Sequence, residues 1–153
     1  MTDRPKISVV LPTFNGAAYL GESLTSIVGQ SFSSWELIIV DDGSTDTTPE
    51  IIQEFIARDS RIRQVRHSEN RNLPTALNTG FSEAKGEYFT WSSDDNVYNQ
   101  NAFQRLIAVL NHSDEIDIVY ADFDMIDAVG QRIRTVHCLS SQELPIRNGI
   151  GAC

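Results

Sequence analysis

Residues 35–46 read Trp35-Glu36-Leu37-Ile38-Ile39-Val40-Asp41-Asp42-Gly43-Ser44-Thr45-Asp46, a run of strand-forming residues that ends abruptly in an acidic turn. Thr47-Thr48-Pro49-Glu50 follows, and hydroxyl, proline and acidic residues in this order are typical of a helix start. A buried strand that passes through a short polar turn into a helix is the repeating unit of α/β proteins. This stretch therefore predicts that class of fold.

The same unit recurs on both sides of residues 35–46. Further strands are expected at 6–11, stopped by Pro12, at 61–66 near a sheet edge, at 87–91 and at 117–125. Further helices are expected at about 17–30, from Pro74 to a C-cap at Gly86, and around Phe103, Leu106, Ile107 and Leu110. The alternation predicts a mostly parallel sheet with helices on both faces. Gly130 then predicts a turn into an antiparallel return over 131–136.

The chain has 153 residues, and we expect residues 1–153 to form one domain. A formal net charge of -9 is unfavourable for binding nucleic acid or an anionic membrane surface. Its two cysteines, Cys138 and Cys153, are too few for a disulfide framework. No apolar run approaches the roughly 20 residues of a membrane span, and the N-terminus lacks a signal-peptide pattern. These features favour a soluble, cytoplasmic chain.

Polar residues follow three of the expected strands, in the stretches Pro12-Thr13-Phe14-Asn15, Asp41-Asp42 and Ser92-Ser93-Asp94-Asp95-Asn96. Ligands of parallel sheets bind outside the carboxyl ends of the strands, where these stretches converge. Adjacent carboxylates repel each other and need hydrogen-bond donors, water or a cation, and oxygen ligands favour magnesium or manganese. The alternative is that the Asp residues only form turns and cap helices.

Three motifs follow one another along the chain: Ser8-Val9-Val10-Leu11-Pro12-Thr13-Phe14-Asn15, then Val40-Asp41-Asp42-Gly43-Ser44-Thr45-Asp46, then Gly86-Glu87-Tyr88 leading to Asp94-Asp95. Their order and intervals, over roughly residues 6 to 127, resemble the family 2 glycosyltransferases. The resemblance implies the GT-A fold, with a Rossmann-like, mostly parallel sheet. It also implies a chain that stops before the acceptor-side half of that fold.

Carried over residue by residue, the resemblance implies a nucleotide pocket lined by Pro12, Thr13, Phe14 and Asn15. Asp42, with Asp41 beside it, is expected to face the base, typically uracil, because a carboxylate accepts the imide N–H. Many relatives have Arg before the residue that matches Asn78, whereas this chain has Leu77, so Arg71 is expected to supply the cation beside the phosphates.

The resemblance places a divalent metal, Mn²⁺ or Mg²⁺, at Asp95 with help from Asp94. In the family this cation bridges the donor diphosphate and stabilises the departing nucleoside diphosphate. Ser92 stands where the first Asp of the commoner motif is expected, so the motif is reduced. Asp122-Phe123-Asp124 also spells Asp-x-Asp, but we interpret it as part of a strand and only a minor metal candidate.

Inverting members of the family use one carboxylate as general base, normally in an acidic motif well after the metal site. The resemblance therefore implies that the base lies beyond Cys153 and that residues 1–153 hold no catalytic residue. Residues 128–153 are interpreted as a hairpin and a tail that resembles the beginning of the acceptor-side half. We expect this chain to bind its donor without transferring the sugar by itself.

The function implied by the resemblance is transfer, with inversion, from a nucleoside-diphosphate sugar, UDP-linked by preference. The acceptor is a glycan, a lipid-linked group or a protein. A non-catalytic nucleotide-binding or regulatory module remains the alternative. A response-regulator receiver would need its acidic pair after the first strand, and a dinucleotide-dependent dehydrogenase would need a glycine-rich turn there. Pro12-Thr13-Phe14-Asn15 fits neither.

The remaining candidates are expected to be structural. His67, His112 and His137 have no spacing that suggests a zinc site, and solvated positions are expected for all three. Trp35 and Trp91 are both expected in the core, although Trp91 could instead face a donor sugar.

Overall fold

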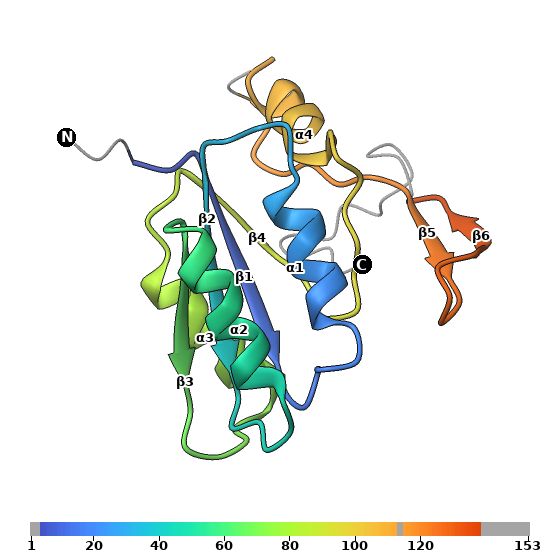
Figure 1. The fold of residues 1–153 in the computed structure, drawn as a ribbon. Coiled ribbons are helices and arrows are strands. Elements are labelled where there is room, and N and C mark those ends of the chain that lie inside the picture. The colour runs from blue at the N-terminus through green and yellow to red at the C-terminus, as the bar shows by residue number, and fades with distance from the viewer. Residues whose placement is uncertain (1–3, 113–114, 139–153) are drawn as a thin grey trace. The chain divides into compact units, whose positions relative to one another are not determined.

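The computed structural model describes residues 4–112 and 115–138 of the chain. The chain divides into two compact units, residues 1–105 and 106–153. The first unit contains a four-stranded parallel sheet in the order β3-β2-β1-β4 (Figure 1). Its strands are β1 (Ile7–Thr13), β2 (Trp35–Asp41), β3 (Ile62–Arg66) and β4 (Tyr88–Trp91). Its helices are α1 (Leu20–Val28), α2 (Thr48–Arg58) and α3 (Asn72–Glu83).

Three further elements complete the described chain. Helix α4 (Ala102–Leu110) runs across the division between the units. Strands β5 (Phe123–Ile126) and β6 (Arg132–Val136) form an antiparallel hairpin in the second unit. Among the described residues, no helix is long and apolar enough to cross a membrane.

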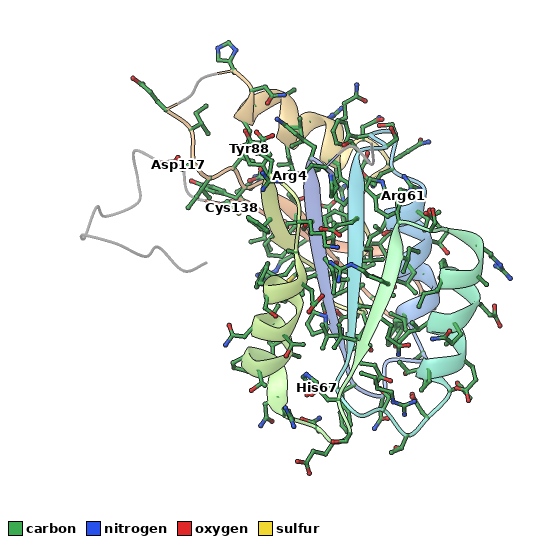
Figure 2. The ribbon with its side chains drawn as sticks, turned by 90° about the vertical axis from the view of Figure 1, so that its left-hand side faces the viewer. Arg4, Arg61, His67, Tyr88, Asp117 and Cys138 are labelled. Atoms are coloured by element: carbon green, nitrogen blue, oxygen red, sulfur yellow. The ribbon has the colours of Figure 1, made fainter. Side chains whose placement is uncertain are left out.

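The two central strands, β1 and β2, are buried along their whole length. Their parallel register runs from Ile7 opposite Trp35 to Thr13 opposite Asp41. Helix α3 packs against both strands on one face of the sheet, and α1 and α2 lie on the other (Figure 2). Helices on both faces explain why the strands are almost uninterruptedly apolar, as the sequence predicted.

Strand β1 continues through Pro12 to Thr13, so the expectation that Pro12 stops it was wrong. The carbonyl of Val10 faces β4 and accepts the N–H of Ser92 at 2.9 Å. Pro12, two residues later, faces the same side, where β4 has already ended at Trp91. The missing N–H of proline therefore removes no bond from the sheet.

Helix boundaries differ from the expectation at two places. Helix α3 begins at Asn72, which puts Pro74 in its first turn, where the missing N–H has no partner to lose. Gly86 is not the C-cap, a place that Ala84 takes in an extended conformation. Gly86 instead allows close approach to β1, because a Cβ there would lie 2.6 Å from the backbone nitrogen of Ser8.

The strand expected over 117–125 was wrong for most of its length. Only Phe123–Ile126 is a strand, and its partner is β6 rather than the parallel sheet. The carboxylate of Asp122 accepts the backbone N–H of Cys138 at 2.9 Å, which closes the open end of the hairpin. Because β6 follows β5 after a short turn, it satisfies the backbone N–H and C=O groups of β5 locally. The predicted antiparallel return is confirmed.

A buried polar cluster links β1, β2 and the end of α3. The Ser8 hydroxyl donates to Glu36 Oε1 at 2.6 Å, and the backbone N–H of Lys85 donates to the same oxygen at 2.6 Å. Arg63 approaches Glu36 Oε2 at 3.2 Å. Burial alone would raise the pKa of Glu36, but these hydrogen bonds and the guanidinium outweigh it and lower that pKa. Glu36 is therefore ionised in the folded chain.

The Glu36 cluster predicts a pH-dependent stability. A carboxyl group whose pKa is lowered on folding stabilises the fold above its unfolded pKa, and this contribution disappears as the pH falls through the folded value. We expect Glu36→Gln to lower the free energy of unfolding by about 1–3 kcal/mol at neutral pH. The difference from wild type should narrow below about pH 4 in urea unfolding curves.

Glu54→Gln is the matched control, because Glu54 pairs with Arg58 at 3.6 Å on the exposed face of α2. Its effect should stay within about 0.5 kcal/mol at every pH. A Glu36→Gln defect that is as large in acid as at neutral pH would contradict the assignment of an ionised Glu36.

Gly80 predicts a steric limit on the packing of α3. A Cβ at Gly80 would lie 2.3 Å from Cγ1 of Val10, a fully buried and β-branched side chain. We expect Gly80→Ala to destabilise the chain by about 1–3 kcal/mol in spite of alanine's better helix propensity. Gly21→Ala in α1 meets nothing within 4 Å and should stabilise by up to about 1 kcal/mol. Equal effects of both substitutions on Tm would refute this packing.

Candidate functional site at the strand ends

The carboxyl ends of the parallel strands are joined by backbone hydrogen bonds. The N–H of Asp42 donates to the carbonyl of Thr13, and the N–H of His67 donates to the carbonyl of Asp41, both at 2.9 Å. His67 marks this end of the sheet in Figure 2. The polar stretches that follow β1 and β2 therefore start from adjacent points, as the sequence predicted.

Asn15 holds the turn after β1 against the turn after β2. Its side-chain oxygen accepts the backbone N–H of Thr45 at 2.8 Å and that of Asp46 at 3.3 Å. Its own N–H donates to the Ser44 hydroxyl at 3.0 Å. Asn15 adopts a φ of 54°, which asparagine tolerates better than most residues. Beside it, Phe14 is 46% exposed.

Asp41 is fully buried and belongs to the scaffold of the turn. Its Oδ1 accepts the N–H of Ser44 at 2.9 Å, and Nε of Arg66 lies 3.2 Å from its Oδ2. The Arg66 contact is an ion pair by distance, and among the described residues Oδ2 accepts no hydrogen bond. The two carboxylates of the Asp41-Asp42 pair therefore have different surroundings.

Asp42 is also buried, and its partners lie just after β3 and just before α3. Nδ1 of His67 lies 2.6 Å from its Oδ1, and the backbone N–H of Arg71 lies 3.0 Å from both carboxylate oxygens. Nε2 of His67 lies 3.0 Å from the Thr79 hydroxyl on α3. The expectation of a solvated His67 was wrong, because this side chain is 8% exposed and bridges two elements.

Asp94 is the carboxylate that ties the loop after β4 to the end of β1. The Thr13 hydroxyl donates to Asp94 Oδ2 at 2.6 Å. Gly16 leaves room for it, because a Cβ at residue 16 would lie 2.1 Å from that same oxygen. The Ser23 hydroxyl of α1 donates to the Ser93 carbonyl at 3.0 Å and holds the loop from the other side.

Asp95, the next residue, is exposed, whereas Ser92 before the pair is buried. In residues 4–112 and 115–138, no group of three or more His, Cys, Asp or Glu side chains is arranged as a metal site. Asp94 and Asp95 are adjacent oxygen donors, and within the part that the structure describes Asp95 makes no hydrogen bond or ion pair. The two residues thus offer a partial set of ligands.

The side chains of the other residues named by the sequence are not part of this network, although the backbone N–H of Arg71 is. Arg71 is exposed at the start of α3, and Asn78 is exposed midway along it. Trp35 is buried as expected, but Trp91 is 49% exposed, so the expectation of core packing for Trp91 was wrong. Its position on β4, the last strand of the sheet order, leaves it less covered.

Residues of the hairpin have local roles. The Asp122 carboxylate pairs with His137 at 2.7 Å, and Asp124 accepts the Thr135 hydroxyl at 2.5 Å. Nδ1 of His137 and the backbone N–H of Cys138 lower the pKa of Asp122. The Asp-x-Asp spelling of residues 122–124 is therefore used in hairpin pairing, and His112 and His137 are exposed as predicted.

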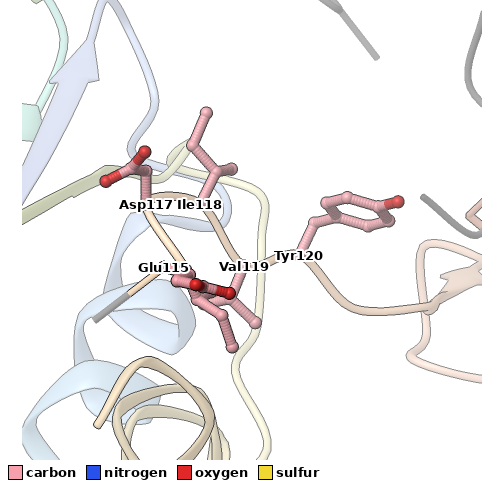
Figure 3. A pocket seen from close by; sticks show the side chains of 6 residues that line it. Glu115, Asp117, Ile118, Val119 and Tyr120 are labelled. Carbon is pink, nitrogen blue, oxygen red and sulfur yellow. The ribbon is translucent and has the colours of Figure 1, made fainter. Parts of the chain in front are cut away.

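An open hollow lies in the second unit, lined by a single stretch of chain, residues 115–120 (Figure 3). It carries the carboxylates of Glu115 and Asp117 beside Ile118, Val119 and Tyr120. None of the strand-end residues lines it. Its two acidic groups offer no cation for a phosphate, so the strand ends remain the better candidate for an anionic ligand.

Comparisons with known proteins agree with the motifs at the strand ends. Residues 8–150 match the sequence profile of a family described as Glycosyl transferase family 2. An uncharacterized glycosyltransferase of Rickettsia prowazekii is 34% identical over 140 residues, which cover 91% of this chain and 42% of the relative. Glycosyltransferase GlyG of Streptococcus pneumoniae is 39% identical over 118 residues, which cover 76% of this chain and 38% of the relative.

Solved structures share the fold. TarS 1-349 of S. aureus in complex with UDP superposes with a TM-score of 0.66 and 27% identity, covering 70% of this chain and 32% of that one. A mannosyltransferase of Pyrobaculum calidifontis in complex with GDP-Man and Mn²⁺ gives 0.65 and 28%, covering 71% and 33%. The chain thus spans well under two thirds of the length of these relatives.

Gly43 generates a test of the strand-end geometry. It has a φ of 82°, and a Cβ there would lie 2.7 Å from the backbone carbon of Glu69. We expect Gly43→Ala to destabilise the chain by about 2 kcal/mol or more, because left-handed strain and a backbone clash add. Gly130→Ala, with a φ of 78° and nothing within 4 Å, should cost only about 1 kcal/mol. If both substitutions lower the Tm equally, the turn at Gly43 does not pack against the backbone at Glu69.

Proposed function

The chain belongs to glycosyl transferase family 2, and we propose that its strand ends bind the nucleoside diphosphate of a sugar donor, with uridine as the preferred nucleoside. Its fold is the GT-A fold of the solved relatives. The observation that carries the proposal is the bond from Thr13 to Asp94, at 2.6 Å. It brings the motif after β1 and the acidic motif after β4 into one place.

The nucleoside end of the proposed site is formed by the turn after β1 and by Asp42. Asn15 fixes the two turns against each other, and Phe14 stays 46% exposed beside them, which leaves an apolar ring for a base or ribose. Asp42 offers a carboxylate to the imide N–H of uracil. One structural relative binds UDP and UDP-GlcNAc, and another binds GDP-Man, which supports a nucleoside diphosphate as ligand.

The diphosphate end needs positive charge in a chain of net charge -9. Asp94 and Asp95 fit a divalent cation, because Mg²⁺ and Mn²⁺ are commonly held by one or two carboxylates, with waters and substrate phosphates completing the coordination. Such a site needs no cage of three protein ligands. Arg71, exposed at the start of α3, is proposed as a second cation beside the phosphates.

In this arrangement the chain's own residues bind and orient the donor. The Thr13 hydroxyl holds the half-buried Asp94 carboxylate, and Asp95 beside it is exposed to solvent. The cation supplies electrostatic stabilisation of the departing nucleoside diphosphate when it is bound. The loop itself is braced on α1 by Ser23, and preorganised ligands lose little free energy on binding. Sugar transfer with inversion by the whole protein, to an acceptor outside the described chain, completes the proposal.

Calorimetric titration with UDP tests the donor site. We expect UDP to bind in the presence of MnCl₂ and to bind at least about tenfold more weakly without divalent metal, a difference of 1.4 kcal/mol. Asp95→Asn should abolish this metal dependence, because the exposed carboxylate is the proposed ligand. Asp117→Asn, which removes an exposed carboxylate of the other unit, is the matched control and should bind like wild type.

Two results would count against the proposal. UDP affinity that is equal with and without manganese would reject the bridging cation. Failure of the wild-type chain to bind UDP, UDP-GlcNAc or GDP-mannose at millimolar concentration would reject a donor site at the strand ends.

A further inference from the structure

Asp42 belongs to a chain of hydrogen bonds with His67 and Thr79, two residues that the sequence motifs do not include. These hydrogen bonds run from the end of β2, through the residue after β3, to the middle of α3. The side chains of His67 and Asp42 are only 7% and 5% exposed. Two polar groups this deeply buried are retained at a cost in desolvation, which other contacts must offset.

The contacts fix the roles of both imidazole nitrogens. A carboxylate only accepts hydrogen bonds, so Nδ1 of His67, 2.6 Å from Asp42 Oδ1, must carry the hydrogen. In the neutral ring, Nε2 is then the acceptor for the Thr79 hydroxyl at 3.0 Å. The Asp42 carboxylate therefore selects the tautomer, and the Thr79 hydroxyl, which can donate, holds the Nε2 side of the same ring.

The acceptor capacity of Asp42 is nearly filled. Its Oδ1 accepts from both His67 and the Arg71 N–H, whereas Oδ2 accepts only its share of the same Arg71 N–H. Each carboxylate oxygen has two acceptor positions. The one acceptor position that is not filled therefore lies on Oδ2. Burial and the three contacts to His67 and Arg71 prevent the carboxylate from rotating.

We infer that His67, whose ring is held by Thr79, is a positioning residue that fixes Asp42 so that Oδ2 accepts one N–H donor from the nucleobase. This inference rests on the proposed donor site and adds a determinant of base selectivity to it. A base whose imide N–H points at Oδ2 donates a hydrogen bond to it and is bound. A base with a substituent at that nitrogen has no hydrogen to donate, and the rigid carboxylate is left without this partner.

The test compares UDP with 3-methyl-UDP, in which a methyl group replaces the N3 hydrogen, by calorimetry in MnCl₂. Wild type should prefer UDP by about tenfold or more, because a hydrogen bond to a charged acceptor is lost. His67→Leu should reduce this preference to less than about threefold. His67→Asn places an amide N–H near the position of Nδ1 and should restore most of the preference.

Thr79 gives an independent pair of variants. Thr79→Val removes the hydroxyl that holds Nε2 of His67 and should reduce the preference for UDP, whereas Thr79→Ser keeps the hydroxyl and should retain it. His112→Leu is the matched control, because His112 is exposed and should leave the preference unchanged. Circular dichroism and Tm establish which variants are folded, and the Thr79 pair carries the test if His67→Leu is not.

The ratio of the two affinities separates positioning from general support of the fold. A merely structural role of His67 would weaken both nucleotides equally and keep their ratio, which would overturn the inference while leaving the donor site intact. The same holds if wild type binds both nucleotides equally well. If wild type binds neither, the proposed function and this inference fall together.

Discussion

The hydrogen bond from the Asp42 N–H to the Thr13 carbonyl, at 2.9 Å, is the constraint on which the strand-end site depends. It extends the parallel pairing of β1 and β2 by one step, to the point where both strands leave the sheet. The turns that follow are thereby close enough for Asn15 to accept two N–H groups from the other turn.

The four carboxylates of the Asp41-Asp42 and Asp94-Asp95 pairs lie at this end of an acidic chain, and local partners offset the repulsion of three of them. The Ser44 N–H and Arg66 stabilise the negative charge of Asp41. His67 and the Arg71 N–H do the same for Asp42. The Thr13 hydroxyl does so for Asp94. Asp95 alone is exposed and has no such partner among the described residues. Each carboxylate that has a partner is fixed in place. The one that lacks a partner is the one that gains most from a cation.

The sequence predicted the fold because β1, β2 and their turns are locally consistent. Their apolar runs, Pro49 at the helix start and the Asp-rich turns all favour the same β-turn-α unit. The sequence did not predict the features that depend on tertiary contacts. The burial of His67 depends on Thr79, twelve residues later on α3, and the shortened strand at 123–126 depends on pairing with β6. Neither contact leaves a periodic pattern in the residues themselves, although a His directly after a strand end was a signal for His67.

The central claim is that three separate strand ends form one nucleotide site. The most direct measurement is a titration of the ¹⁵N-labelled chain with UDP in MgCl₂, followed by two-dimensional ¹H–¹⁵N NMR. The account predicts that amide shifts concentrate at residues 13–15, 41–43 and 93–95 and saturate with a single affinity. Shifts at residues 115–120, with none at the strand ends, would contradict it.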